Sequence, residues 1–430
     1  MTNPWPRVNL GEVTVNHDGR RIPVRGADRK SGPYPYYGAS GIVDHVDRYL
    51  FEGLHLLVAE DGENLRTRQT PVAFLADGRF WVNNHAHIVT GNDRADTRFL
   101  CYALAATEIS GYLTGSAMPK LTQRAINAIE VPLPPIDAQR AIAETLGSLD
   151  DKIEQNRRTG AKLEGLARAV FKAWFVDFEP VKAKAAGATA FPGMPPETFA
   201  ALPARFEDSE LGPVPQGWES CCQRVSALER AGTLLIGDGY RAKRSELAET
   251  GVPFIRAGNV NGTIITDGAE LLGKPAIQKA GVKRSQTWDT VFTSKGTVGR
   301  IGLITPTTGD VVYAPQVCFW RAMNRDALSP FLLHLWMKSE SFTAQWMSVK
   351  GQTDMADFVS LSDQRAMSML VPPPELQREF DNIVRPIVEL IAASAAESAK
   401  LVGMREYLLP RLLSGRVRVR DAETNFERVL

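Results

Sequence analysis

The sequence predicts an α+β fold, with two mixed α/β domains joined and separated by two long helices that pack as an antiparallel coiled coil. The first observation is a repeat: a proline-rich segment leads into a Gln-Arg pair and a long helical pattern at Val131–Pro135 and again at Val371–Pro374. From Gln139 and Gln377 onward the two copies align at a constant offset of 238 residues. Such a period predicts two equivalent modules in one chain.

Composition gives the second observation. The chain has 430 residues, 44% hydrophobic and 23% charged, which is typical of a globular protein of two to four domains. No apolar run approaches the roughly 18–20 residues of a membrane span, and residues 1–6 lack the layout of a signal peptide. None of the four cysteines has metal-ligand spacing, so reduced thiols and a cytoplasmic location are expected. The net charge of +1 means that any basic face is local or supplied by a partner.

Residues 1–136 are predicted to form the first domain. Short β-rich stretches such as 54–59 and 80–82 alternate with Gly, Asp and Asn turns. Prolines then exclude a helix at 132–135. The second domain, predicted for residues 214–374, shows the same character, and a tryptophan lies near the start of each (Trp5 and Trp218).

The third observation is a pair of helical patterns, at 137–180 and 375–415. Apolar residues recur at alternating spacings of four and three, as in the a and d positions of a coiled coil. Both seams are apolar at their ends and small or polar in the middle, which predicts that the two middles meet and that the helices are antiparallel. The alternative is that each helix packs on its own domain. The predicted helix–helix seam comprises Ile142, Leu149, Ile153, Asn156, Gly160, Leu163, Val170, Phe380, Ile387, Ile391, Ser394, Ser398, Leu401 and Leu408.

Three further features concern the connections. Pro386 is expected to kink the second helix, and Pro410 with Gly415 to end it. Residues 181–213 are rich in Ala, Pro and Gly and are interpreted as a linker with little core of its own. Residues 416–430 form a C-terminal tail.

Signs of catalysis are weak. The glycine-rich segment 296–302 lacks the Gly-Lys-Ser/Thr ending of a phosphate-binding loop. His85 and His87 could place two imidazoles on one side of a strand, but no third ligand lies near, so no metal is predicted. Asp150-Asp151-Lys152 resembles a nuclease cluster but lies on the coiled-coil helix. No bond chemistry, cofactor or metal is therefore predicted in this chain.

Binding is better supported, because loops that combine polar, glycine and aromatic residues suit contacts to phosphates and base edges. Such loops recur in both predicted domains, whereas any one of them alone could be a solvated turn. The candidate DNA-binding residues are Tyr36, Tyr37, Ser40, Asn64, Arg66, Ser116 and Lys120 in the first domain, and Arg256, Asn259, Lys295, Thr297, Arg300 and Gln352 in the second.

With these motifs in order, the chain resembles the specificity subunits of type I restriction-modification systems over nearly its whole length. Residues 34–43, followed by 49–51 and 61–62, resemble one common type of target recognition domain, and residues 115–122 resemble the exit of that domain. Segments 211–218, 254–256 and 295–302 resemble corresponding parts of the second. The second half departs from the pattern at its exit, where Lys350-Gly351-Gln352-Thr353-Asp354-Met355 is only loosely similar.

The resemblance implies a non-catalytic subunit that binds double-stranded DNA. Each recognition domain would read one half of a bipartite, asymmetric target, and the helices would set the spacer and dock two methyltransferase subunits. Those partners would supply S-adenosylmethionine-dependent adenine methylation, and restriction/translocase subunits would supply ATP- and magnesium-dependent cleavage. Two other hypotheses remain open: a two-headed protein-binding scaffold without a DNA role, and a self-sufficient restriction or methylation enzyme.

Overall fold

The computed structural model describes residues 5–209, 212–218, 221–352 and 357–419. These residues form two compact units: the first is Met1–Gln155 with Ser398–Leu430, and the second is Asn156–Glu397. The units divide inside both long helices, whereas the sequence predicts domain boundaries at the helix ends. Among the described residues, none of the helices is both long enough and apolar enough to cross a membrane.

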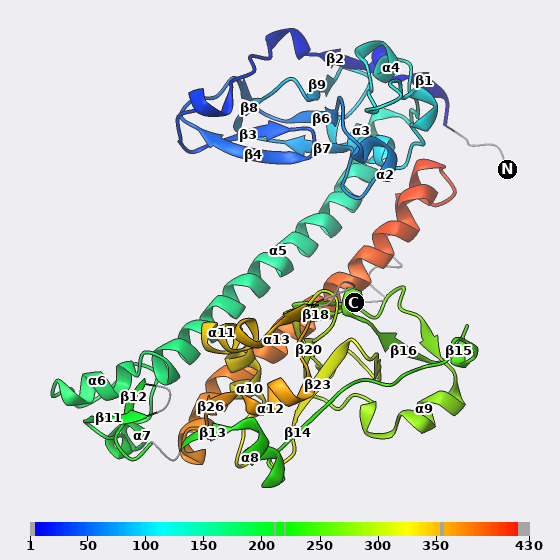
Figure 1. Cartoon of the computed structure of the whole chain (residues 1–430). Helices are drawn as coiled ribbons and strands as arrows, with labels where there is room; N and C mark the ends of the chain where they lie inside the picture. The colour runs from blue at the N-terminus through cyan, green and yellow to red at the C-terminus, as the bar shows by residue number, and fades with distance from the viewer. Residues whose placement is uncertain (1–4, 210–211, 219–220, 353–356, 420–430) are drawn as a thin grey trace. The chain divides into compact units, whose positions relative to one another are not determined.

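The first unit contains two four-stranded sheets (Figure 1). One is antiparallel, in the order β2 (Thr14–Asn16), β9 (Ala86–Gly91), β6 (His55–Ala59), β7 (Ala73–Ala76). The other has the order β4 (Gly41–Val46), β3 (Tyr34–Gly38), β8 (Arg79–Val82), β5 (Phe51–Glu52), and its β3–β8 pair is parallel. Strands β6 and β9 are almost wholly buried, so their sequences read as apolar runs and do not alternate.

Short elements complete the first unit. Strand β1 (Arg7–Asn9) pairs with β10 (Glu130–Pro132), which leads into the long helix. Helix α3 (Thr97–Ala105) packs on β6, β7 and β9 and is capped by the Asp96 side chain. The others are α1 (Leu10–Val13), α2 (Asn64–Thr67), α4 (Gln123–Asn127) and 3-10 turns at Asp18–Arg20, Gly26–Asp28 and Ser110–Tyr112.

The second unit repeats the antiparallel sheet strand for strand, and its other sheet shares the parallel pair but differs in strand order. Its antiparallel sheet has the order β14 (Leu234–Gly237), β23 (Val317–Ala322), β20 (Thr290–Thr293), β21 (Ile301–Leu303). Its other sheet has the order β15 (Leu247–Ala248), β19 (Leu271–Leu272), β16 (Val252–Ile255), β22 (Val312–Tyr313), and the β16–β22 pair is again parallel. Strand β13 (Cys222–Arg224) pairs with β26 (Ser368–Leu370) as β1 pairs with β10.

The remaining elements of the second unit are mostly short. Helix α10 (Pro330–Met337) packs on β20 and β23, as α3 does in the first unit. The others are α8 (Val225–Arg230), α9 (Lys274–Ala280), α11 (Glu340–Val349), α12 (Leu361–Ala366), the pairs β17 (Val260–Asn261) with β18 (Thr263–Ile264) and β24 (Gly351–Gln352) with β25 (Asp357–Phe358), and 3-10 turns at Arg244–Glu246, Ala257–Asn259 and Gly281–Lys283.

Residues 181–209 and 212–213 are mostly exposed, as expected of a segment with little core of its own, but four of their apolar side chains are buried in the second unit, so the segment is not a free linker. They carry most of α6 (Glu179–Ala185), α7 (Pro196–Ala201), and β11 (Phe206–Ser209), which pairs with β12 (Gly212–Pro215). Their few apolar side chains join one buried cluster with the end of the long helix: Val181, Met194, Phe199 and Leu202 lie with Trp174, Phe178 and Trp218. Widely spaced large side chains in an Ala-rich segment leave no periodic signal in the sequence.

Both predicted long helices are present as single helices of 40 residues, α5 (Ile136–Phe175) and α13 (Pro374–Leu413). Helix α13 begins with a proline at its first position, where the missing N–H costs nothing. It continues across Pro386 and past Pro410, so the prediction that Pro410 ends it is wrong. The helix ends at Leu413, and Gly415 (φ +64°) closes it, with the Arg416 N–H bonded to the Arg411 carbonyl at 2.9 Å.

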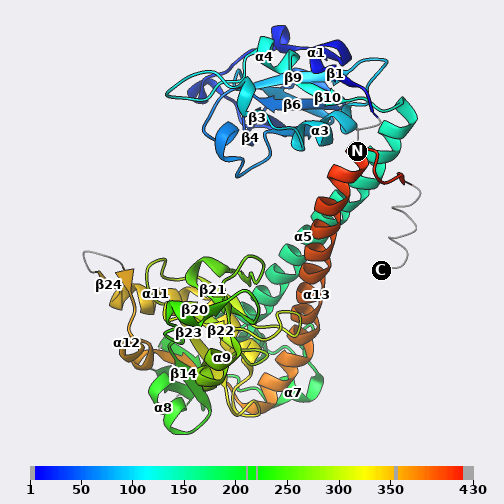
Figure 2. The same ribbon diagram turned by 90° about the vertical axis from the view of Figure 1, so that its right-hand side faces the viewer.

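Within each unit, segments of α5 and α13 lie side by side and antiparallel (Figures 1 and 2). In the first unit the N-terminal half of α5 meets the C-terminal half of α13, and Asp150 pairs with Arg405 at 2.8 Å. In the second unit the C-terminal half of α5 meets the N-terminal half of α13, where Phe175 and Phe380 have ring centroids 5.0 Å apart. The seam residues Ile142, Leu149, Asn156, Phe380, Leu401 and Leu408 are buried, and Ile153, Gly160, Leu163, Val170, Ile387, Ile391, Ser394 and Ser398 are half-buried.

The seam departs from the predicted heptads in the second unit. There Ala167 and Phe171 are more buried than Val170, and Val388 and Ala392 are more buried than Ile391. Ala167, Phe171 and Val388 belong to the same buried cluster as the core of the unit. Ala392 packs beside that core, where its carbonyl lies 3.5 Å from the Thr307 hydroxyl. A helix that packs on a globular core as well as on another helix needs an apolar face wider than an a/d seam.

Candidate nucleic-acid interface

The candidate residues of the first unit gather in two adjoining loops, 61–66 and 114–120, here called the first loop cluster. Asp61 and Lys120 form an isolated β-bridge, and the Gly62 N–H donates to the Pro119 carbonyl at 3.2 Å. Arg66 donates to the carbonyls of Gly115 (3.2 Å) and Ser116 (3.4 Å). The structure therefore brings together Asn64, Arg66, Ser116 and Lys120, which are up to 56 positions apart in the sequence.

The first loop cluster is built as a set of tight turns. The Asn64 side chain holds Thr70 by both of its amide atoms, at 2.9 and 3.0 Å, so it shapes the loop from within. Gly115 has φ +86°, and a Cβ atom there would lie 2.2 Å from the Met118 carbonyl oxygen. Only glycine therefore fits at this turn. Arg66, Ser116 and Lys120 are exposed, so their side chains are the ones available to a ligand.

The three candidates on the β3–β4 hairpin, Tyr36, Tyr37 and Ser40, differ in their exposure. Tyr36 is fully buried, with its hydroxyl 3.1 Å from the Val24 N–H, so the prediction that it contacts DNA is wrong. Strand alternation explains the error, because neighbouring tyrosines point to opposite faces. Tyr37 is half-buried against Phe74 and Phe80, and burial raises its pKa. Ser40 is exposed in the turn.

Backbone contacts connect this hairpin to the first loop cluster. The Asn83 N–H donates to the Tyr37 carbonyl at 3.0 Å, and the Asn83 side chain accepts from the His85 N–H at 2.8 Å. The His85 ring in turn lies 2.9 Å from both carboxylate oxygens of Asp61. Tyr37, Ser40 and the first loop cluster therefore belong to one continuous edge of the first unit.

Five candidates of the second unit gather in a corresponding way, in turns 256–259 and 295–300, here called the second loop cluster. The Arg300 guanidinium lies 3.4 Å from the Ala257 carbonyl and 3.3 Å from the Val260 carbonyl, and so ties one turn to the other. Asn259 is structural, because its side chain accepts from the Arg256 N–H and donates to the Ile265 carbonyl. Arg256, Lys295 and Thr297 are exposed.

The exit of the second unit is only partly described. Lys295 forms an isolated bridge with Phe358, and the Lys350 ammonium lies 2.8 Å from the Asp357 carboxylate. Gln352 lies in β24, which pairs with β25. Its side chain and residues 353–356, predicted to face DNA, lie outside the described residues.

One segment of each cluster, 61–66 in the first and 295–300 in the second, occupies the same place in the repeat. The Asp61–Lys120 bridge of the first unit corresponds to the Lys295–Phe358 bridge of the second. The residue after each bridge makes an equivalent hydrogen bond: the Leu121 N–H donates to the Glu60 carbonyl at 2.8 Å, and the Val359 N–H donates to the Ser294 carbonyl at 2.9 Å. Thr122 and Ser360 then cap the helices that follow. The sequence gives little sign of this correspondence, because only Gly62 with Gly296 and Arg66 with Arg300 are identical between residues 61–66 and 295–300.

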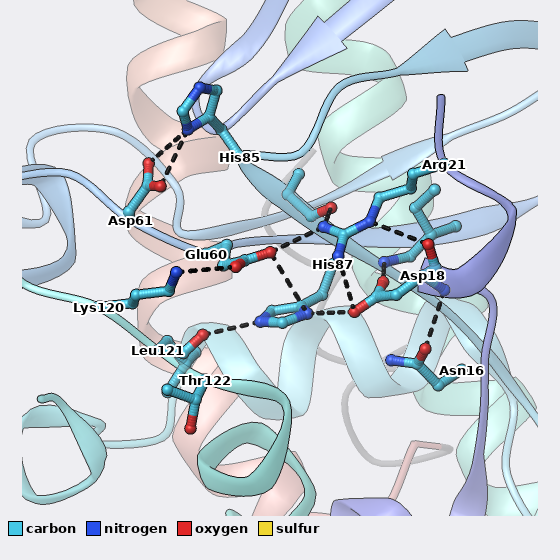
Figure 3. A network of polar contacts seen from close by, with 12 residues as sticks. Asn16, Asp18, Arg21, Glu60, Asp61, His85, His87, Lys120, Leu121 and Thr122 are labelled. Carbon is cyan, nitrogen blue, oxygen red and sulfur yellow. Dashed lines mark hydrogen bonds and ion pairs between the residues drawn. The ribbon is translucent and has the colours of Figure 1, made fainter. Parts of the chain in front are cut away.

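A charged network lies directly behind the first loop cluster, and the sequence analysis missed it (Figure 3). Glu60 pairs with Lys120 at 3.3 Å and with Arg21 at 2.8 Å, and Asp18 pairs with His87 at 2.5 Å. Burial alone would raise the pKa of Glu60, but its bonds to Arg21 and Lys120 and the charge of His87 hold that pKa below its usual value. Only His87, an ionisable residue inside the apolar strand β9, gives a signal in the sequence, because the other members of the network lie in turns and loops.

His85 and His87 do not form the pair that a metal site would need. His85 precedes β9 and is half exposed beside Asp61, whereas His87 lies inside β9 and is buried beside Asp18. Strand alternation does not apply to His85, because it lies in the turn before the strand. Among the described residues, no group of three or more His, Cys, Asp or Glu side chains is arranged to hold a metal ion.

Comparison with known proteins agrees with this geometry. Residues 3–164 match the family model described as the type I restriction modification DNA specificity domain. A putative type I restriction enzyme specificity subunit from Haemophilus influenzae is 37% identical over 33% of this chain and 36% of its own length. A type I restriction enzyme specificity subunit from Methanocaldococcus jannaschii is 24% identical over 85% of this chain and 80% of its own.

The fold matches a solved structure as well. The crystal structure of the S subunit of a type I restriction-modification system from M. genitalium superposes with a TM-score of 0.65 at 16% identity, covering 96% of this chain and 99% of that one. At this level of identity the match concerns the fold. It agrees with the mixed α/β units and the paired long helices described above.

Proposed function

Because the chain belongs to the family of type I restriction-modification specificity subunits, we propose that it reads a bipartite, asymmetric DNA sequence, with each loop cluster contacting one half. One observation carries the proposal: residues 61–66 and 295–300 occupy equivalent places in the repeat but differ at four of their six positions. Equivalent placement suits two equivalent contacts with a duplex. Different side chains suit two different base sequences, since direct readout depends on which donors and acceptors reach the base edges.

The exposed cations suit the contacts that fix a protein on DNA. Arg66 and Lys120 in the first loop cluster and Arg256 and Lys295 in the second can approach phosphates. Most of them already have a partner: Lys120 pairs with Glu60, and Arg256 pairs with Glu270. These carboxylates would restrain each cation until a phosphate replaces them. The near-neutral net charge suits a subunit whose partners share the electrostatic attraction to DNA.

The long helices are proposed to set the spacer between the half-sites and to dock two methyltransferase subunits. A 40-residue helix is about 60 Å long at roughly 1.5 Å per residue, which exceeds the roughly 34 Å of one DNA turn. We propose that this chain itself catalyses neither methylation nor cleavage of DNA. S-adenosylmethionine, ATP and magnesium would act in the methyltransferase and restriction/translocase partners.

The test uses the full chain assembled with its methyltransferase partners. Mapping methylated adenine in cells that carry the system would identify the target, and duplexes altered in one half at a time would report discrimination. Ser116→Ala should reduce discrimination at one half-site and Thr297→Ala at the other, while Arg7→Ala, an exposed cation outside both clusters, should change neither. Loss at both halves from either variant would contradict independent reading.

The same preparation separates the alternatives. A protein-binding scaffold would show no steep loss of duplex affinity as salt rises, whereas a DNA reader should. A self-sufficient enzyme would methylate or cleave DNA when the chain alone is given methyl donor, ATP and magnesium. Turnover by the chain alone would overturn the proposal.

A further inference from the structure

His87 is a buried imidazole whose two ring nitrogens both face hydrogen-bond acceptors (Figure 3). It lies in the central strand β9 and is 2% exposed. Nδ1 lies 2.5 Å from the Asp18 carboxylate, and Nε2 lies 2.7 Å from the Leu121 carbonyl. A neutral imidazole carries one N–H, so it can donate to only one of these acceptors. Although burial alone would raise the pKa of Asp18, its hydrogen bonds with His87 and the Ile88 N–H and the charge of Arg21 hold that pKa below its usual value. Asp18 is therefore an acceptor, and the imidazolium is the form of His87 that donates to both groups.

The groups around His87 come from three parts of the chain. Asp18 and Arg21 belong to the 3-10 turn at Asp18–Arg20 and the residue after it, Glu60 follows β6, and Lys120 precedes α4. Glu60 lies 4.0 Å from the His87 ring and bonds both Arg21 and Lys120. Burial alone would lower the pKa of His87, but the Asp18 hydrogen bond, the Leu121 carbonyl and the charges of Asp18 and Glu60 outweigh it and raise that pKa.

His87 acts on the first loop cluster through Leu121. This residue directly follows Lys120, and its N–H is held by the Glu60 carbonyl while its own carbonyl is held by His87. Lys120 in turn pairs with Thr114 through both backbone hydrogen bonds, at 2.7 and 2.8 Å. The imidazolium thus secures the base of the 114–120 loop.

In the second unit, neutral groups hold the backbone carbonyl that corresponds to that of Leu121. In the central strand pairs, His87 lies opposite Val58 and Cys318 lies opposite Phe292, so Cys318 takes the place of His87 and Ser294 that of Glu60. The Val359 carbonyl, which corresponds to that of Leu121, accepts from the Gln364 amide at 3.3 Å. Gln364 also lies 3.4 Å from the Cys318 sulfur. A glutamine amide donates at any pH.

We propose that protonated His87 is a positioning residue for the first loop cluster, so that reading of one half-site, and of that half alone, weakens as the pH rises. This inference rests on the proposed function. Deprotonation removes one N–H, so either Asp18 or the Leu121 carbonyl loses its donor and the loop that carries Lys120 loosens. Because the pKa of His87 lies above its ordinary value of 6.5, the bond is intact below about pH 6.5 and is lost as the pH rises through the raised value.

The experiment measures duplex discrimination by the full complex between about pH 6 and 9. At each pH, cognate DNA is compared with duplexes altered in the first or in the second half-site. We expect discrimination at the half read by the first loop cluster to fall on the order of ten-fold, the usual effect of losing one charge-assisted hydrogen bond, while the other half stays constant. The double variant Asp18→Asn/His87→Gln, which imitates the neutral second unit, should show a flat profile at both halves.

A second readout does not depend on DNA. Histidine-selective isotope labelling of the wild-type chain should show one imidazole that titrates above the ordinary range, and the signal should vanish in the double variant. Equal pH dependence at both half-sites, or a flat wild-type profile with sequence-specific binding intact, would overturn the role of His87. Absence of sequence-specific binding at every pH would instead overturn the proposed function.

Discussion

Gln139 and Gln377, 238 residues apart, make the same three hydrogen bonds in the two units. Each amide donates to the carbonyl of a proline five residues earlier and to a carbonyl just before a short helix, and each accepts from the N–H of that helix's cap residue. For Gln139 these partners are Pro134, Arg94 and Asp96. For Gln377 they are Pro372, Ala327 and Ser329. The glutamine that marks the repeat in the sequence thus fastens each long helix to its domain.

Replacing either glutamine by leucine is expected to lower the free energy of unfolding by about 2–4 kcal/mol, because three buried backbone groups lose their partners. Both side chains are nearly inaccessible, at 0% and 3% exposure, so water cannot replace them. Chemical denaturation measures the effect. Gln155→Ala, an exposed position on α5, should change stability by less than about 0.5 kcal/mol. A loss that small at Gln139 or Gln377 would contradict the fastening role.

The polar centre of the seam is the second test. Asn156 donates to the Ser394 carbonyl at 3.4 Å and to the Glu397 carboxylate at 2.7 Å, so repeat mates meet as predicted. Because the helices are antiparallel, a heptad inserted after Gly160 alone should break the pairing. A heptad inserted also near Ser394 should preserve it and lengthen the spacer by about 10 Å, or about three base pairs. Methylated-adenine mapping reads the gap directly, and an unchanged gap would mean that the helices do not set it.

A polar triad in the first unit is apolar in the second. Asp150 accepts from the Tyr102 hydroxyl and from Arg405, each at 2.8 Å. The corresponding residues of the second unit are buried and apolar, namely Leu335, Val388 and Ala167.

We expect Asp150→Val alone to destabilise the first unit by about 1–3 kcal/mol, because Tyr102 and Arg405 lose their acceptor. The triple change Tyr102→Leu/Asp150→Val/Arg405→Ala should be close to neutral, because no partner is left unpaired. Thermal unfolding of both variants checks this, and additive losses across the three positions would refute it.

Asp381 makes stability depend on pH. Burial raises the pKa of its carboxyl to about 6, although the Ser329 hydroxyl and Arg385 act in the opposite direction. The folded pKa exceeds the unfolded value of 3.8, so ionisation of Asp381 opposes folding above about pH 6 and has no effect below about pH 4. Asp381→Asn, which keeps an acceptor for Ser329, should therefore stabilise the chain by up to about 2 kcal/mol at pH 8 and by nothing at pH 4. Denaturation at the two pH values measures this, and equal effects would contradict the shifted pKa.

Sequence reasoning located both loop clusters but sorted their residues poorly. It selected Lys120 and Lys295, which are exposed, together with Tyr36, which is core, and Asn64 and Asn259, which hold their own loops. Residue type and loop composition predict that a turn can bind a ligand. They do not predict which side chain of the turn forms hydrogen bonds within the turn itself. That depends on which backbone groups, such as the carbonyls of Thr70 and Ile265, lie beside the turn in the folded chain.

The sequence by itself determined the two long helices, their repeat offset and their antiparallel seam, because helical periodicity is local and a matching interruption can be read from the chain. Only the tertiary structure decided that four apolar side chains between Val181 and Leu202 join the core of the second unit, that Tyr36 is buried and that His87 faces two acceptors. These outcomes depend on burial and hydrogen bonding between segments far apart in sequence. Such long-range burial and hydrogen bonding leave no period or motif in the sequence, because many different residue pairs can pack or hydrogen-bond at the same place.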